Sequence, residues 1–249
     1  MTRQNCLQLE QFNGVIVGNG AIGSALLHNL LKREELHRVV VLGRSPRSIP
    51  EDPRITFLTF DAGSPESVFA AAAEVQRTLD RVHLLVNTVG LLHSENQLPE
   101  KHLKAVSSDH LQHSFQVNAA LLPLLAQAFG KMLRHEAPAV FASLSARVGS
   151  IEDNRLGGWY SYRASKAAHN MLLKSVAREW RVSHRNVTVA ALHPGTVRSR
   201  LSEPFLTERY PHRILTPEQS ANALLDVINT LCPKDSGCFL DWQGKPVPW

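Results

Sequence analysis

The sequence predicts an α/β fold in which helices cover both faces of a doubly wound parallel sheet of about seven strands. Two observations predict this class. Short apolar runs alternate with longer amphipathic segments along the chain, as repeated strand–helix units require. The runs at 38–42 and 82–86 are also almost entirely apolar, which is typical of strands that are buried on both faces.

The elements follow from that alternation. Strands are expected at 13–18, 38–42, 54–59, 82–87, 138–144, 186–192 and 237–241. Helices are expected at 21–33, 65–79, 107–135, 160–182 and 217–231. Two helix starts are well marked, because Ser64 and Thr216 each precede a proline and can cap the first turn. Gln219 adds a capping box to the second start.

Two long segments, 91–106 and 198–215, are irregular and contain prolines. In a doubly wound sheet, ligands bind at the carboxyl ends of the strands, and these segments are expected as the loops there. The 249 residues, 43% hydrophobic and 20% charged, fit a single dinucleotide-binding domain over 1–249.

Composition indicates the expected cellular compartment of the protein and the class of ligand it binds. Three scattered cysteines, no signal pattern and no apolar run of spanning length favour a cytoplasmic protein that neither enters a membrane nor needs disulfides. The net charge of +5 comes from dispersed basic residues, so an anionic small ligand is expected rather than nucleic acid. Twelve histidines occur without a metal-ligand spacing, so no metal site is expected.

The segment 15–27 carries a dinucleotide-binding pattern. An apolar run leads into Gly18-Asn19-Gly20-Ala21-Ile22-Gly23 and then into a helix-compatible stretch, the context that the fingerprint of a Rossmann-type sheet requires. Gly18 can make the tight turn, Gly20 lets backbone N–H groups approach a pyrophosphate, and Gly23 lets helix and strand pack closely. The phosphate would lie at a helix N-terminus, and an ordinary glycine turn is the alternative.

The second strand ends in Val41-Leu42-Gly43-Arg44-Ser45, without an acidic residue. An acidic side chain there would bind the ribose hydroxyls of NAD and repel a 2′-phosphate. Gly43 is expected to leave that space open, and Arg44 can pair with the phosphate, with Arg47 assisting. NADP(H) is therefore expected ahead of NAD(H), and a solvated loop arginine is the alternative role of Arg44.

Tyr162 and Lys166 stand four residues apart in a run without Gly or Pro, so they share one face of a predicted helix. A cation beside a phenol is expected to lower the pKa of Tyr162. Such a tyrosine can donate and accept a proton near neutral pH. By itself the pair also fits a surface lysine beside a half-buried tyrosine.

Seven ordered landmarks give the chain a resemblance to the short-chain dehydrogenase/reductase family, from about residue 12 to the end. They are Gly18 to Gly23, Asp61-Ala62, Asn87-Thr88-Val89-Gly90, Asn118, Ser145, the Tyr162–Lys166 pair and His193-Pro194-Gly195-Thr196-Val197. Residues 145–151, 157–160 and the Pro-Trp C-terminus resemble most the bacterial C-factor-like group, which is named for a cell–cell signalling protein. The glycine loop is one residue shorter than the family's, and Val17 replaces its usual threonine.

The resemblance implies an NAD(P)-dependent oxidoreductase of the carbonyl reductase or alcohol dehydrogenase type, acting on a small carbonyl or alcohol. Tyr162 would exchange the proton, and Lys166 would lower its pKa and bind the nicotinamide ribose. Asn118 would support a water and a helix carbonyl that link Lys166 to solvent, and Ser145 would hold the substrate oxygen. A homo-oligomer, dimer or tetramer, is expected.

The resemblance also assigns residues around the ligands. The cofactor would be bound by Gly18, Asn19, Gly20, Ala21, Ile22, Gly23, Arg44, Asp61, Ala62, Asn87, Gly90, Tyr162, Lys166, Pro194, Gly195 and Val197. The substrate would contact Leu91, Leu92 and Trp159, for which plain loop packing is an equal alternative.

The serine is the open assignment. The family's hydroxyl usually stands three residues before a glycine, but here Ala146 has that spacing from Gly149 and Ser145 comes one residue earlier. Neighbouring strand side chains point to opposite faces. Either a bulge or early strand end turns Ser145 into the site, which is the favoured interpretation, or the hydroxyl is missing there.

Two function classes remain. The first is the enzyme described above, and the second is a nucleotide-binding signalling or regulatory protein of the same fold with reduced or no turnover. Tyr162, Lys166 and Asn118 favour the enzyme, because a pure binder has no need of a proton relay. The fold alone does not separate the two.

Overall fold

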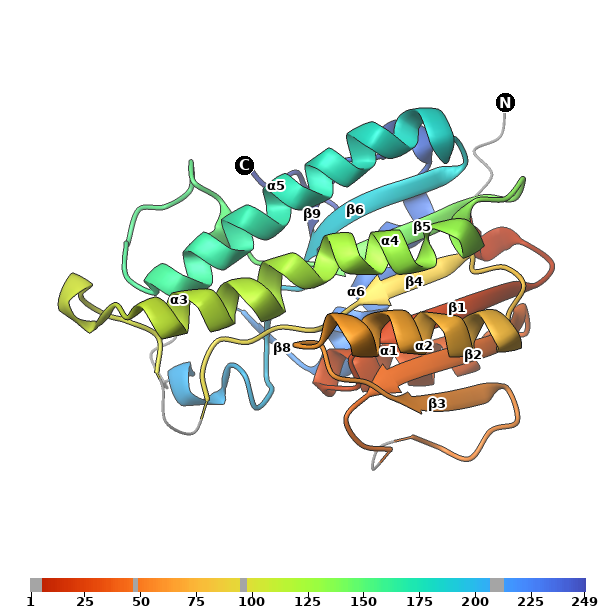
Figure 1. Cartoon of the computed structure of the whole chain (residues 1–249), viewed down its shortest axis with the longest axis horizontal. Helices are drawn as coiled ribbons and strands as arrows, with labels where there is room; N and C mark the ends of the chain where they lie inside the picture. The colour runs from red at the N-terminus through yellow and green to blue at the C-terminus, as the bar shows by residue number, and fades with distance from the viewer. Residues whose placement is uncertain (1–5, 47–48, 95–97, 207–212) are drawn as a thin grey trace.

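The computed structural model describes residues 6–46, 49–94, 98–206 and 213–249, and its centre is a seven-stranded parallel sheet (Figure 1). The strand order is β3-β2-β1-β4-β5-β6-β9. The bounds are β1 Phe12–Val17, β2 Leu36–Gly43, β3 Ile55–Thr59, β4 Leu84–Asn87, β5 Ala139–Leu144, β6 Val187–His193 and β9 Cys238–Asp241. The order reverses between β1 and β4, and such a switch point is where this architecture binds ligands.

Helices cover both faces of the sheet (Figure 1). One face carries α2 (Pro65–Thr78), α4 (Leu121–Leu133) and α5 (Tyr160–Ser183), and the other carries α1 (Ala21–Leu31) and α6 (Pro217–Thr230). Alternate residues of β1 enter the two cores, Val15 and Val17 on the α5 side and Ile16 on the α1 side. The predicted fold class is therefore confirmed.

The predicted element ends lie within two residues of the observed ones, with one exception treated below. Ser64 caps α2 by accepting a hydrogen bond from the Ser67 N–H at 3.1 Å. Thr216 and Gln219 form the predicted capping box at the start of α6. Both helix starts are thus fixed by local side-chain chemistry.

The prediction of one helix over 107–135 is wrong in its middle. The segment forms α3 (Ser108–Phe115), a π-helical turn η3 (Gln116–Ala120) and α4. Pro123 has no N–H, and its ring would crowd the carbonyl of Ala119 in a regular helix, which a wider π turn relieves. Asn118 lies inside this turn.

The two loop segments leave the carboxyl ends of β4 and β6 and meet beyond the sheet. His93 Nε2 lies 3.1 Å from the carbonyl oxygen of Arg200. Strand β7 (Thr196–Val197) lies just before the second segment and pairs with β8 (Ile214–Leu215) at the end of that segment. In the described parts of the chain, no helix has the length and apolar character that crossing a membrane would take.

Candidate active site

The turn between β1 and α1 is built around glycines. Gly18 has φ +96°, in the left-handed region that side chains disfavour. A Cβ at Gly23 would overlap the carbonyl oxygen of Gly18, so the helix packs directly on the turn. A Cβ at Gly20 would meet nothing within 4 Å, so the space at the start of α1 is open. This cradle fits a pyrophosphate on the helix N-terminus, whose first turn includes Ala21 and Ile22.

The side chain of Asn19 overturns one expectation. The space beside Gly43 is filled, because a Cβ on Gly43 would overlap the Asn19 carboxamide. Asn19 Nδ2 donates to the carbonyl oxygen of Ser45 at 2.5 Å. The carboxamide can lie there because Gly43 has no side chain, and the bond satisfies one of its donors. Arg44 lies exposed beside this contact, and Arg47 lies outside the described residues.

The end of β4 brings two predicted cofactor residues to the same edge. Asn87 is buried, donates to Ser143 Oγ at 3.0 Å and accepts from the Val89 N–H at 3.1 Å. A Cβ on Gly90 would lie 3.9 Å from Lys166 Nζ and 4.0 Å from Asn118 Oδ1. Gly90 therefore stands beside the predicted catalytic side chains.

The remaining predicted cofactor residues sit in turns at the same edge. Asp61 is exposed, and its Oδ1 accepts from the Gly63 N–H at 2.9 Å, while Ala62 packs on the core. Gly195 has φ +79°, and a side chain there would crowd Leu215 and Trp242. Pro194 and Val197 flank this turn. Their positions are compatible with the predicted nicotinamide loop.

Tyr162 lies in the first turn of α5, and Lys166 follows one turn later on the same face. Both are buried, with exposed fractions of 9% and 2%. Lys166 Nζ lies 6.0 Å from the centroid of the Tyr162 ring and donates to the carbonyl oxygen of Leu144 at 2.9 Å. Among the described residues, none forms a hydrogen bond with the Tyr162 hydroxyl, which leaves it available to a substrate oxygen.

Burial shifts both groups away from their ordinary values. It raises the pKa of Tyr162 to about 12 and lowers the pKa of Lys166 to about 8. The expected lowering of the Tyr162 pKa is therefore wrong, because burial removes the solvent that would stabilise the phenolate. Near neutral pH the tyrosine is protonated and suited to donating its proton.

The Asn118 side chain binds the backbone of the loop that follows β4. Its Oδ1 accepts from the Leu91 N–H at 2.7 Å, and its Nδ2 donates to the Leu91 carbonyl at 2.7 Å and to Ser165 Oγ at 3.0 Å. Its own carbonyl accepts from His169 Nδ1 at 3.1 Å. Burial and the Lys166 charge hold the pKa of His169 well below its ordinary range, so this imidazole is neutral. A water expected on the Asn118 carbonyl would share that oxygen with His169.

Ser145 faces α5 but engages a residue two turns beyond Tyr162. Its side chain is buried, with 3% exposed, and its Oγ donates to Asn170 Oδ1 at 2.6 Å. No hydrogen bond joins Ser145 to Tyr162 in the parts of the chain that the structure describes. The strand ends at Leu144 without a bulge in its pairing to β6. This contact ties the end of β5 to α5, and the role of Ser145 on the substrate stays a prediction.

A series of aromatic ring contacts runs from Tyr162 through Trp159 to the two loop segments. The Trp159 ring lies 6.3 Å from the Tyr162 ring, edge to face, and 5.0 Å from the Phe205 ring. Phe205 in turn lies 5.7 Å from His93. We call Trp159, Phe205 and His93 the aromatic wall. It borders the site on one side.

The two predicted leucine contacts differ in what they offer a ligand. Leu92 has only 4% of its surface exposed and packs inside the protein. Leu91 is half-buried, and its backbone is held by Asn118. Packing is thus the better description of Leu92.

Several residues around Tyr162 were not anticipated from the sequence. His169 and Asn170 lie on the face of α5 that carries Lys166, and the spacing of three and four residues is a signal that could have found them. Glu100 contacts Ser161 across 61 residues of sequence and carried no local signal.

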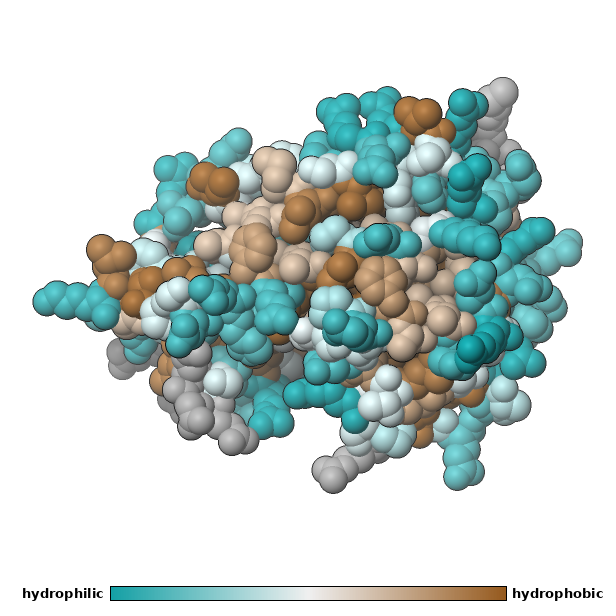
Figure 2. Space-filling view, in the orientation of Figure 1, coloured by the Kyte–Doolittle hydropathy of each residue, from teal (hydrophilic) through white to brown (hydrophobic). Residues whose placement is uncertain are grey.

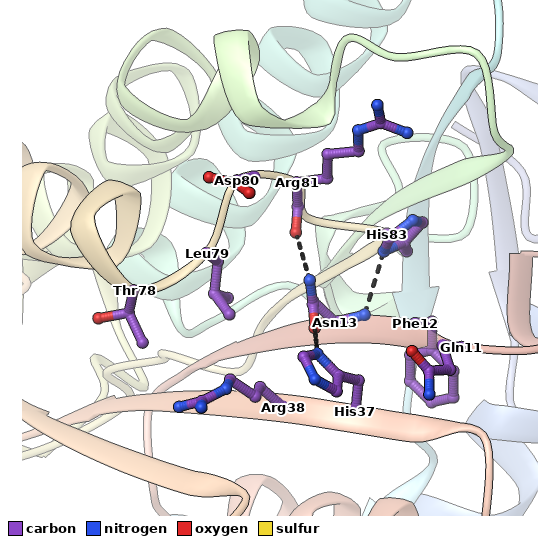
Figure 3. Close-up of a pocket in the computed structure, with 10 residues that line it drawn as sticks. All are labelled: Gln11, Phe12, Asn13, His37, Arg38, Thr78, Leu79, Asp80, Arg81 and His83. Atoms are coloured by element: carbon purple, nitrogen blue, oxygen red, sulfur yellow. Dashed lines mark hydrogen bonds between the residues drawn. The ribbon is translucent and has the colours of Figure 1, made fainter.

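A separate hollow of about 380 Å³ lies at the opposite edge of the sheet, where β1 and β2 begin (Figure 3). Its polar groups largely pair with one another. The Asn13 N–H donates to His83 Nδ1 at 3.0 Å, and Asn13 Nδ2 donates to the Arg81 carbonyl at 3.0 Å. This hollow is far from Tyr162 along the strands and has no part in the candidate active site.

Comparisons with known proteins point to one family. The family model described as short chain dehydrogenase matches residues 14–209. A 1-hydroxy-2-glutathionyl-2-methyl-3-butene dehydrogenase of Rhodococcus sp. (strain AD45) is 32% identical over 189 residues, which are 76% of this chain and 78% of that protein. C-signal of Myxococcus xanthus is 35% identical over 134 residues, 54% of this chain and 70% of that protein.

Two solved structures, both of carbonyl reductases, have a fold similar to that of this chain. An NADPH-bound carbonyl reductase from chicken fatty liver superposes with a TM-score of 0.84 at 27% identity, covering 96% of this chain and all of that one. The carbonyl reductase Sniffer of D. melanogaster has a TM-score of 0.83 at 22% identity over 96% of this chain and all of that chain, which supports the fold alone.

Proposed function

The chain belongs to the short-chain dehydrogenase family of oxidoreductases, and we propose from that premise that it is an NADPH-preferring carbonyl reductase whose proton donor is Tyr162. The observation that carries this proposal is the buried Tyr162, whose hydroxyl forms no hydrogen bond with the residues that the structure describes, with Lys166 one turn away. The family assignment makes the chain an enzyme that uses NAD(P), and the substrate and residue roles are the proposed part.

The residues divide the work as follows. The bound nicotinamide would supply the hydride. Tyr162, protonated near neutral pH, would donate to the substrate oxygen. One N–H of Lys166 is fixed on the Leu144 carbonyl, so its charge stays next to the tyrosine as the proton leaves. Asn118 would hold the loop at Leu91 beside both.

The cofactor would lie along the carboxyl edge, from the glycine turn at Gly18 to the Pro194-Gly195 turn. NADPH is proposed ahead of NADH because Arg44 is exposed at the end of β2, where no acidic side chain would repel a 2′-phosphate. The carbonyl reductase from chicken fatty liver, described as NADPH bound, supports the same choice. Asn19 would have to turn away from Gly43 if the phosphate occupied that space.

The aromatic wall argues for a substrate with an apolar or aromatic group on its carbonyl, since such rings contact apolar surface well. A homo-oligomer is also proposed. Figure 2 shows apolar side chains on the face formed by α4 and α5, and two apolar side chains of α5, Met171 and Val182, are exposed. Sedimentation of the purified protein tests that state, and a monomer at every concentration would refute it.

The test of the function is a screen of NADPH and NADH oxidation against aldehydes, ketones and quinones, followed by Tyr162→Phe. We expect this variant to lose roughly 10²–10⁴-fold in kcat because only the transferable proton is removed. Tyr160→Phe, on the same turn and exposed, is the matched control and should keep its rate. An unimpaired Tyr162→Phe enzyme would rule out the proton role.

A second candidate is a nucleotide-binding signalling protein with little turnover. It is favoured by Ala146 at the position where a hydroxyl is expected, and by the engagement of Ser145 with Asn170. Tight NADP(H) binding without turnover of any compound in the panel would support this candidate.

A further inference from the structure

The helix that carries Tyr162 begins without a cap of its own. Trp159, the residue before α5, has φ +50° and ψ +44°, a left-handed conformation that is uncommon for a large side chain, and provides no side-chain cap. Gly157 and Gly158 before it both have φ +64°. The first N–H groups of a helix lack partners within it, so α5 needs an acceptor from elsewhere in the chain.

Glu100, in the first loop segment, supplies those acceptors. Its carbonyl oxygen accepts from the Trp159 N–H at 2.5 Å. Its carboxylate accepts from the Ser161 N–H at 3.2 Å through Oε2 and from the Ser161 hydroxyl through Oε1. Both side chains are buried, with exposed fractions of 3% and 1%. One distant residue therefore holds the two positions that flank the start of the catalytic helix.

The chemistry of this contact favours a charged carboxylate. Burial opposes the charge, but the hydrogen bonds from Ser161 and from the Glu100 backbone, together with the charge interaction with His110, hold the pKa of Glu100 below its ordinary value. The N-terminal end of a long helix also favours an anion. His110 of α3 lies 3.0 Å away, between its Nδ1 and Oε1 of Glu100, and is equally buried. The loop, α3 and α5 thus meet on one carboxylate.

The contact between Glu100 and the start of α5 holds two residues that adjoin Tyr162. Ser161 is its neighbour in the chain, and the Trp159 ring packs edge to face on its ring. Lys166 is fixed separately, on β5, so it does not hold the first turn of α5. Proton transfer depends steeply on position, and a displacement of about 1 Å can cost on the order of 10² in rate.

We propose that Glu100 is a positioning residue for the reaction: by capping α5 from the loop segment 91–106, it fixes the position of the Tyr162 hydroxyl. This inference rests on the proposed role of Tyr162 as proton donor. It also explains why a strained Trp159 persists, because the bond from its N–H to the Glu100 carbonyl holds it in place.

The test compares Glu100→Ala, Glu100→Gln and Ser161→Ala with the exposed control Glu152→Ala. Each is measured for cofactor Kd, kcat and KM at a temperature where circular dichroism shows it folded. Glu100→Ala should lower kcat by about 10–100-fold with cofactor Kd unchanged. Glu100→Gln keeps an acceptor for the Ser161 N–H and should recover most of kcat. Ser161→Ala, which loses only the hydroxyl bond, should lie between them, and the control should match the wild type.

Several results would overturn the inference. They are a Glu100→Ala kcat within twofold of wild type, equal losses in the Ala and Gln variants, or a loss seen only in cofactor affinity. If Glu100→Ala does not fold, a wild-type kcat in Ser161→Ala overturns it. A Tyr162→Phe variant that turns over normally would instead remove the proposed function on which the inference rests.

Discussion

Replacing Ser145 by alanine separates a tie between strand and helix from a group that touches the substrate. The Ser145 hydroxyl donates at 2.6 Å to Asn170 Oδ1, and both side chains are at least 97% buried. The alanine would leave that buried oxygen without its donor, which costs about 1–3 kcal/mol. In a chain of 249 residues each kcal/mol lowers Tm by about 2–4 °C, so a fall of about 2–12 °C is expected.

The catalytic consequence follows from the same geometry. Since the bond leads to Asn170 and not to Tyr162, kcat of Ser145→Ala at 20 °C should stay within about fivefold of wild type. A hydroxyl that held the developing charge on the substrate oxygen would instead be worth about 10²–10³ in kcat. Ala146→Ser, which puts a hydroxyl at the expected spacing before Gly149, should raise kcat if the site lacks one.

Calorimetry and initial rates of NADPH oxidation measure both effects. Asn170→Ala is the partner variant, and the double variant should show a coupling of about 1 kcal/mol in the free energy of unfolding. A hundredfold loss of kcat in Ser145→Ala with an unchanged Tm would refute the reasoning and restore Ser145 as the substrate-binding serine.

Two further predictions concern charge. Arg44→Ala should weaken NADPH binding about 10–100-fold, because charge-assisted hydrogen bonds are lost, and should leave NADH binding within about twofold, as measured by calorimetry. The control Arg38→Ala, at the far end of β2, should change the binding of neither cofactor. Equal losses for both cofactors in Arg44→Ala would contradict the assignment. Lys166 has a folded pKa of about 8 against 10.5 for the free group, so between these values the unfolded chain binds more protons and the free energy of unfolding of the wild type rises with pH. Lys166→Met lacks this term, and the wild-type value minus the variant value should therefore rise by about 3 kcal/mol from pH 8 to pH 10.5 in denaturant titrations. A difference that does not change with pH would show that the lysine is not desolvated.

The sequence by itself determined the sheet and most of the helix ends. The inner strands are short and mostly apolar on both faces, and each well-marked helix start has its capping residues nearby, as with Ser64 and the Thr216–Gln219 box. These are local properties, and a parallel sheet with covered faces is the arrangement that satisfies all of them together. The glycine turn and the spacing of Tyr162 and Lys166 are local in the same way. The break at η3 was missed because the helical pattern runs through 107–135, although Pro123 signals an interruption within it.

Tertiary structure decided which side chains meet. Whether Ser145 faces Tyr162 or Asn170 depends on how β5 docks on α5, and no spacing in the sequence contains that information. The pKa of Tyr162 was mispredicted for a related reason, because the spacing shows the ammonium but not the loss of solvent around the phenol. Glu100 reaches Ser161 only after the loop has folded back on the helix. Local patterns specify elements because their hydrogen bonds close within a few residues, whereas burial and long-range contacts exist only once the elements are packed.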